Sequence, residues 1–289
     1  MTAVLRHELA LAYHSLTGYV FGAFLLIFTG IGAMLYNINA SVANFEYVLH
    51  FISMIFILII PILTMRVIAE EKRQKTDQLL SSLPISSTEI VTGKFFALGI
   101  LFLIPVLIIS LYPLLFSRFG EVYLPTAYGS LLAFFLMGLA LISIGVFLSS
   151  LTESQGMAAG LSAAVMLFLY YSASLAESIS ATETGALIGL LVTAVLAGLL
   201  VRSLTRSDLA GLAMTLILAA AVGGIYILRR ELLKNLLPDL LHRISPFERF
   251  TVFVNGVLDL TSLVYYLSLI VFFLFLTVQS LEKRRYSGS

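Results

Sequence analysis

The chain has 289 residues, of which 60% are hydrophobic and only 11% are charged. A soluble domain carries roughly 25% charged residues, because its surface must be polar, so this composition predicts an integral membrane protein. The net charge of +1 offers no basic surface for nucleic acid. The chain has no cysteine and its four histidines are scattered. We therefore expect neither a metal site nor another cofactor.

Eight segments are apolar enough to cross a bilayer, which takes about 20 apolar residues in a helix. None contains Asp, Glu, Lys or Arg in its interior, and two of them, 184–201 and 209–228, are weaker because they are built largely of Gly, Ala, Leu and Val. They predict an all-α, polytopic helix bundle that forms a single domain over residues 1–289. The eight segments are 16–36, 49–65, 95–116, 128–148, 156–175, 184–201, 209–228 and 262–281.

Most Lys and Arg residues fall on one side if both termini are cytoplasmic, as the positive-inside rule requires. The first apolar segment is too long for a signal-peptide core, so we expect it to remain as a membrane anchor. Residues 1–15 carry Val4, Leu5, Leu9 and Ala12 on one helical face. This pattern favours an amphipathic helix on the cytoplasmic interface over a flexible tail.

Residues 66–94 are the most polar part of the chain and are expected to form a cytoplasmic loop. Residues 70–75 contribute two acids and three bases, and residues 76–83 predict a short helix that ends at Pro84. Ser86 and Glu89 have the spacing of a capping box, so the next helix should begin there. The loop is interpreted either as a docking surface or as an ordinary solvated loop.

Residues 229–261 are amphipathic and are expected to lie in the outer interface or to re-enter the membrane as a broken pair of helices. Leucines dominate the first half, Pro238 interrupts the pattern, and Phe247, Phe250, Val254 and Val257 continue the apolar stripe. A structural lid and part of a substrate exit path are the two interpretations.

The sequence lacks the residues of several kinds of chemistry. No acid, Lys or Arg lies within a predicted span, and His50 sits at a boundary, which disfavours a proton- or sodium-coupled transporter. The one Gly-Lys pair, Gly93-Lys94, is followed by Phe95 and does not form a P-loop. We therefore expect no enzymatic activity in this chain.

The run A-E-E-K-R-Q-K-T-D-Q-L-L-S-S-L-P-I-S-S-T-E-I-V-T-G-K-F resembles the permease subunits of type-2 ATP-binding-cassette exporters, and most of all their GldF-like branch. The run S-P-F-E-R-F and the final span resemble the same family. Many relatives have Gly where this chain has Lys75. The shared positions of the first run are Glu70, Glu71, Lys72, Arg73, Thr76, Leu79, Leu80, Pro84, Glu89, Ile90, Val91, Gly93 and Lys94.

The resemblance implies a six-span core, to which residues 184–228 add a hairpin. It implies a coupling helix near residues 75–83 that docks on a separate ATP-binding subunit, where ATP would be hydrolysed. The residues expected at this interface are Glu70, Glu71, Arg73, Lys75, Thr76, Leu79, Leu80 and Pro84. The residues expected in the external segment are Phe247, Glu248, Phe250 and Gly256.

The resulting hypothesis is an exporter permease of a prokaryotic cell membrane, paired with a second copy or a related permease. An accessory extracytoplasmic protein is a further expected partner. Lipid-linked, peptide and polysaccharide molecules are the candidate cargoes, and the sequence does not distinguish them. The alternative is a non-transporting membrane module that couples ATP hydrolysis to an envelope or surface machine. A stand-alone channel is disfavoured because the spans lack polar residues.

Overall fold

The computed structural model describes residues 2–14, 16–76, 85–179, 185, 187–192, 194–195, 208–228 and 239–287. The described chain is helical and contains no strand. It divides into two compact units. Unit 1 comprises Met1–Phe168 and Arg249–Ser289, and unit 2 comprises Leu169–Glu248.

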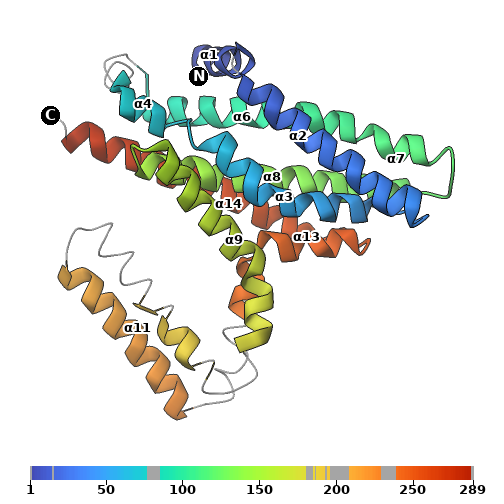
Figure 1. The fold of residues 1–289 in the computed structure, drawn as a ribbon. Coiled ribbons are helices and arrows are strands. Elements are labelled where there is room, and N and C mark those ends of the chain that lie inside the picture. Colours follow the sequence, from blue (N-terminus) through green and yellow to red (C-terminus); the bar gives the residue numbers. More distant parts are fainter. Residues whose placement is uncertain are drawn as a thin grey trace. The chain divides into compact units, whose positions relative to one another are not determined.

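Unit 1 holds most of the helices (Figure 1). Two helices, α9 and α13, cross the boundary between the units. In chain order the helices with a part in unit 1 are α1 (Thr2–His14), α2 (Leu16–Gly32), the π-helix η1 (Ala33–Asn39), α3 (Glu46–Thr64), α4 (Ala69–Gln74), α6 (Ser87–Ile109), α7 (Leu111–Phe116), α8 (Leu124–Leu151), α9 (Gln155–Ile179), α13 (Pro246–Val254) and α14 (Leu260–Ser287).

Six helical segments of the described chain are long and apolar enough to span a membrane, which confirms six of the eight predicted spans. They are Gly18–Asn39, Glu46–Gln74, Ser87–Phe116, Leu124–Leu151, Gln155–Leu175 and Leu260–Lys283. Half of the predicted span 184–201 lies outside the described residues. The predicted span 209–228 forms α11 (Asp208–Leu228), whose described apolar part is Leu212–Gly224.

Helix α8 is the centre of unit 1, because α3, α6 and α14 all pack against it. Two glycines of α8 allow this close approach. A Cβ at Gly138 would overlap the Phe102 ring, and a Cβ at Gly145 would overlap the Thr64 side chain. One turn before Gly138, Phe134 lies 4.7 Å from Phe56 between ring centroids and is fully buried. The two glycines and this aromatic ring therefore let α8 interdigitate with α3 and α6.

The N-terminal helix lies at one end of unit 1 (Figure 1). Residues 2–14 form α1 as predicted, and Val4 on its apolar face is buried. This helix packs against α2 and α6. Helices α1 and α4, the start of α6 and the C-terminal end of α14 all lie toward one end of unit 1, here called the α4 end (Figure 1). That this end faces the cytoplasm stays a prediction.

Two ionisable residues that the sequence placed outside the spans are buried in the helices that form those spans. Helix α3 begins at Glu46, three residues before the predicted span, and Glu46 is only 2% exposed. Helix α6 begins at Ser87, eight residues before the predicted span, so Lys94 lies two turns inside it. Hydropathy places the start of a span at its first apolar residue, whereas a helix starts at its cap.

Unit 2 joins the second half of α9 to residues 239–248. The Ser245 hydroxyl donates to the carbonyl oxygen of Leu169 at 2.8 Å, and the Ser172 hydroxyl donates to that of Leu241 at 3.4 Å. The ring of Phe247 meets that of Tyr170 edge-on at 5.2 Å between centroids. These contacts hold the segment that leads into α13 against α9.

Candidate functional site

The junction between α3 and α4 is organised by a serine at the end of α8. The Ser149 hydroxyl accepts hydrogen bonds from the backbone N–H groups of Ile68 (3.3 Å) and Ala69 (3.1 Å). It also donates to the carbonyl oxygen of Met65 at 3.3 Å. Because the first N–H groups of a helix have no partner within it, this contact starts α4 and fixes it to α8.

The end of α4 is set by an unusual backbone conformation. Lys75 adopts φ +56°, the left-handed region, and its N–H donates to the carbonyl oxygen of Lys72 at 3.2 Å. A residue with a Cβ pays an energetic cost in this region, whereas glycine does not. A glycine would therefore be accommodated at this position without strain.

Lys94 is the most deeply buried cation of the α4 end, with only 1% of its side chain exposed. Its Nζ donates to Oε1 of Glu71 at 2.6 Å, to Oε1 of Glu8 at 2.7 Å and to the carbonyl oxygen of Val67 at 3.0 Å. An ammonium has three N–H donors, and these three acceptors use all of them. One side chain thus ties α6 to α1, to α4 and to the turn before α4.

A second buried lysine ties α4 to α8. Lys72 is 5% exposed, and its Nζ donates to the carbonyl oxygen of Ser150 in the last turn of α8. The Ser280 hydroxyl of α14 donates to the same oxygen at 3.5 Å. Displacing α4 would therefore disturb buried polar contacts with α1, α6 and α8. It would also affect α14, because Ser280 donates to the same Ser150 oxygen as Lys72.

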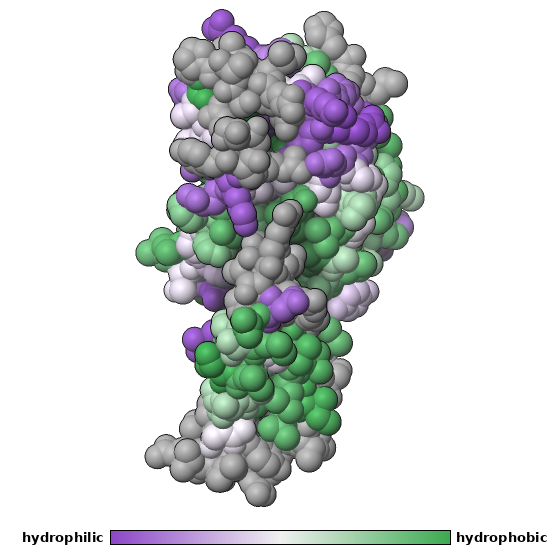
Figure 2. Space-filling model, turned by 90° about the vertical axis from the view of Figure 1, so that its left-hand side faces the viewer, coloured by the Kyte–Doolittle hydropathy of each residue, from purple (hydrophilic) through white to green (hydrophobic). Residues whose placement is uncertain are grey.

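The predicted interface residues divide into an inner and an outer set. Glu71 belongs to the inner set, since it binds Lys94. Arg73 and Lys75 are exposed, and Glu70 is half-buried and accepts a hydrogen bond from the Gln74 amide at 3.1 Å. Figure 2, which looks onto the left-hand side of Figure 1, shows hydrophilic side chains gathered toward the top of this face.

The remaining predicted interface residues lie at or beyond the end of α4. Thr76 is half-buried, and its hydroxyl donates to the carbonyl oxygen of Glu71 at 3.3 Å. Leu79, Leu80 and Pro84 lie outside the described residues, so the predicted helix over residues 76–83 stays a prediction. The described part of the expected docking surface is therefore the outer face of α4.

The entry into α6 confirms the predicted capping box. The Ser86 hydroxyl accepts from the Glu89 N–H at 3.2 Å, and the Ser86 N–H donates to Oε2 of Glu89 at 3.4 Å. The capping box fixes the start of α6, and with it the position of Lys94 two turns inside that helix.

Four residues were not predicted to belong to this site: Glu8, Lys72, Ser149 and Ser150. Lys94 was predicted to lie at the end of a loop. The feature of the sequence that indicates a position of Lys94 inside α6 is its distance of two turns from the capping box.

The predicted external segment forms α13 and the turn after it. In unit 1, Phe250 is fully buried and lies 6.0 Å from Phe134 between ring centroids. The Ser130 hydroxyl donates to the carbonyl oxygen of Phe253 at 2.9 Å. Residues 229–238 lie outside the described residues. The predicted stripe is wrong at Val257, which lies beyond the helix end and is 56% exposed, because the buried face continues through Phe253 instead.

In unit 2, two of the predicted external residues lie at the start of α13. Phe247 is buried against Tyr170, as described above. The N–H of Glu248 donates to the Ser245 hydroxyl at 3.2 Å, and its Oε1 lies 4.0 Å from Nδ1 of His242. The four predicted external residues thus belong to both units.

Gly256 ends α13 for a conformational reason. It adopts φ +82°, and its N–H donates to the carbonyl oxygen of Phe253 while the next N–H, of Val257, donates to that of Val252. This pair of bonds is a Schellman motif, in which the left-handed residue is usually glycine. The structure supports a helix-ending role for Gly256.

Asp259 starts α14 immediately afterwards. Its carboxylate accepts hydrogen bonds from the N–H groups of Thr261 and Ser262, both at 3.0 Å, and from the Ser262 hydroxyl at 2.6 Å. The hydroxyl, followed by the backbone N–H groups, holds the pKa of Asp259 below its usual value. The short turn between α13 and α14 is therefore defined at both ends by helix caps.

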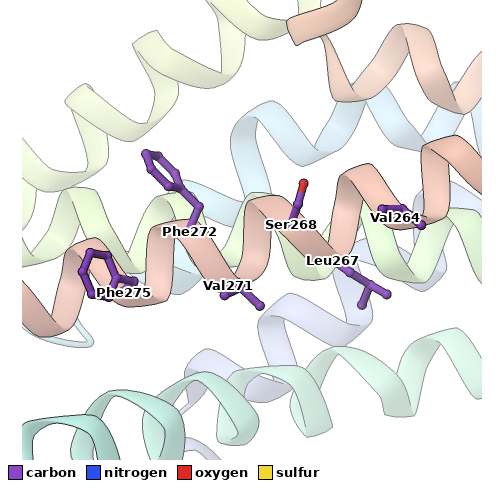
Figure 3. A pocket seen from close by; sticks show the side chains of 6 residues that line it. All are labelled: Val264, Leu267, Ser268, Val271, Phe272 and Phe275. Carbon is purple, nitrogen blue, oxygen red and sulfur yellow. The ribbon is translucent and has the colours of Figure 1, made fainter.

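One open apolar groove runs along α14, with a volume of about 590 Å³ (Figure 3). Five of its lining side chains are apolar and one is a serine, so it suits a lipid or an apolar helix better than a polar ligand. Among the described residues, no group of His, Asp and Glu side chains is arranged to hold a metal ion. The lining residues are Val264, Leu267, Ser268, Val271, Phe272 and Phe275.

The comparisons with known proteins agree with the helical architecture. The sequence model of the ABC-2 family transporter proteins matches residues 25–182, which is more than half of the chain. This range includes α4, Lys72 and Lys94. No curated protein matches the chain. A multi-span helical chain that matches this family over these helices is a membrane component of an ABC transporter, and the chain belongs to the ABC-2 transporter family.

Proposed function

We propose that this chain is the permease subunit of an ATP-binding-cassette exporter and that its α4 end receives a separate ATP-binding subunit. Family membership implies an ATP-binding cassette partner. The observation that supports α4 as the receiving element is its combination of an exposed outer face, with Arg73 and Lys75, and an inner face fixed by buried polar contacts.

The geometry suits the transmission of movement from α4 to the spans. Lys94 connects α4 to α6 and α1, and Lys72 connects α4 to α8. Buried ionic contacts are short and directional, and breaking one leaves an unpaired buried charge. A push on the outer face of α4 would therefore move the spans together with α4 rather than deform α4 alone.

Affinity purification of the chain from its native membrane in mild detergent tests the partner. A P-loop ATPase in stoichiometric amount supports the proposal, and recovery of the chain without one contradicts it. Replacing Leu79 and Leu80 by Asp should reduce the recovery of that ATPase if they form the predicted coupling helix. Asp substitution of the exposed Phe119 and Tyr123, in the connection between α7 and α8, is the matched control.

The alternative is a membrane module that couples ATP hydrolysis to an envelope or surface machine without moving a cargo. The resemblance to the GldF-like branch supports it, since that branch is named for gliding motility. Both functions need the same ATPase contact at α4. Reconstitution of the purified complex into vesicles distinguishes them, because only an exporter moves lipid-linked, peptide or polysaccharide cargo across the bilayer in an ATP-dependent way.

The remaining expected partners and the location follow from the same proposal. The complex would contain a second copy of this chain or a related permease, and an accessory extracytoplasmic protein could join it. It would reside in the cell membrane of a prokaryote with the α4 end on the cytoplasmic side, where ATP is available.

A further inference from the structure

Glu46 is a carboxyl group in an apolar setting, at the end of α3 that is opposite α4. Its residue is 2% exposed, and its Oε2 is buried without a hydrogen-bond partner. The preceding Phe45 is fully buried and packs its ring on those of Tyr112 (5.8 Å) and Phe116 (6.3 Å). The residue next to Glu46 is therefore held in an aromatic cluster.

No cation is placed to balance a charge on Glu46. The elements that pack against α3 are α2, η1 and α8, and α7 packs on Phe45 just before it. The sequences of these four elements contain no Asp, Glu, Lys, Arg or His. Their titratable groups are the phenols of Tyr19, Tyr36, Tyr112 and Tyr128. Among the described residues, no ion pair reaches Glu46.

The other ionisable residues near this end in the sequence face outward. Tyr47 and His50 follow on α3 itself and are exposed, as are Arg118 and Glu121 in the connection between α7 and α8. Two donors, the backbone N–H of Glu46 and the Asn44 side chain, do reach the carboxyl. They cannot serve its Oε2, which has no partner.

A second buried acceptor without a donor lies in the same connection between the first two spans. Asn37 in η1 uses its amide nitrogen to donate to the carbonyl oxygen of Val42 at 2.7 Å, and its Oδ1 is buried without a partner. Buried polar atoms are nearly always hydrogen-bonded, so two lone acceptors in one short segment indicate a missing donor. An ionised carboxylate cannot supply a donor, whereas a protonated one carries an O–H group.

We propose that Glu46 is a proton-binding site, which holds its proton while the end of α3 is packed and releases it when that end opens to water. The carboxyl loses its water shell on burial, and two hydrogen bonds to one oxygen do not replace that shell for an ionised group. The neutral acid avoids this cost and offers an O–H donor at Oε2. This site is independent of the proposed docking of an ATP-binding subunit at the α4 end.

Dicyclohexylcarbodiimide tests the site, since this apolar reagent reacts with protonated carboxyl groups in apolar surroundings. The full chain in lipid nanodiscs is treated between pH 6 and pH 9 and the peptides are identified by mass spectrometry. We expect an adduct at Glu46 at pH 6 that is lost as the pH rises, and none at the exposed Glu121. No adduct at Glu46 at any pH, or an adduct yield that does not change with pH, overturns the proposal.

Thermal unfolding of the Glu46→Gln variant gives a second, independent measurement. The amide mimics the neutral acid, so the Tm of the variant should equal that of the parent chain near pH 4, below the unfolded pKa of about 4.3. It should exceed that of the parent chain near pH 9, because the unfolded parent chain gains stability by releasing the proton as the pH rises. The variant Glu121→Gln is the matched control and should follow the parent chain at every pH. If Glu46→Gln lowers the Tm at both pH values, the carboxylate is ionised and the proposal fails.

Discussion

The Nζ atom of Lys94 lies 2.6 Å from Oε1 of Glu71, and this pair joins α6, which begins the third span, to α4, which follows α3. Glu71 has 23% of its side chain exposed, whereas Lys94 has 1% exposed. The lysine therefore depends on its partners for charge compensation far more than the glutamate does. Together with Glu8, the pair makes α1, α4 and α6 one connected element at the α4 end.

Replacing Lys94 by Met should destabilise the chain by about 3–5 kcal/mol, the usual cost of removing one partner of a buried ion pair. The substitution leaves two carboxylates facing each other with no cation between them. Glu8→Gln and Glu71→Gln should each cost less, because Lys94 keeps one carboxylate and the Val67 carbonyl oxygen. Thermal unfolding in mild detergent measures all three, and Arg73→Met on the exposed face is the control. Equal stability of Lys94→Met and the parent chain would contradict this assignment.

Replacing Lys75 by Gly should stabilise the chain, or at least not destabilise it. The left-handed conformation at φ +56° costs a residue with a Cβ about 1 kcal/mol, a cost that glycine avoids. The gain is reduced because glycine also has more freedom in the unfolded chain. The same substitution at Arg73, inside α4, should destabilise by up to about 1 kcal/mol, since glycine disfavours a helix. A lower Tm for Lys75→Gly than for Arg73→Gly would show that the backbone at residue 75 is not left-handed.

Replacing Gly145 by Ala should destabilise the chain by about 1–3 kcal/mol, the range observed when a methyl group is forced into a packed core. A Cβ there would overlap the Thr64 side chain, which donates to Ile60 and has no room to move. Gly160→Ala is the control, because nothing lies within 4 Å of a Cβ at that helical position. It should leave stability unchanged or raise it slightly. Equal effects of the two substitutions would contradict the close packing of α3 on α8.

Replacing Asp259 by Ala should cost about 1 kcal/mol, as expected for the loss of an N-cap. The folded pKa of Asp259 is below its unfolded value, so its stabilising effect is present above the unfolded pKa of about 3.9. The effect is lost as the pH falls through the lower, folded pKa. The difference in Tm between Asp259→Ala and the parent chain should therefore shrink on going from pH 7 to pH 3. A difference that is independent of pH would show that the carboxylate does not act as the cap.

The sequence predicts the parts of this fold that depend on local patterns. Six spans follow from hydropathy, and the start of α6 follows from the spacing of Ser86 and Glu89. The contacts of Lys94 cannot be predicted from local patterns, because Lys94 is 86 residues from Glu8 and 23 from Glu71. From the sequence, a charged residue next to a predicted loop is expected to be solvated. Only the packing of its helix against other helices shows that it is buried. The same limit explains why Glu46 was not predicted as a buried residue.

The external segment shows a second limit of local patterns. Helical spacing predicts that the apolar stripe continues from Phe250 to Val257. However, Gly256 adopts a left-handed conformation, which ends α13 and turns the chain. After such a turn, helical spacing no longer relates one side chain to the next. Phe253, one turn after Phe250, is the residue that continues the buried face.

Docking of an ATP-binding subunit on the outer face of α4 is tested most directly by site-specific cross-linking. The chain contains no cysteine, so Arg73→Cys introduces a single thiol on the exposed side of α4. In native membranes, a short thiol-to-amine cross-linker should join this variant to a P-loop ATPase, which mass spectrometry identifies. Arg118→Cys, exposed at the other end of the spans, should give no such product. A cross-linked ATPase from Arg118→Cys, or none from Arg73→Cys in a complex that still co-purifies with its ATPase, would contradict docking at α4.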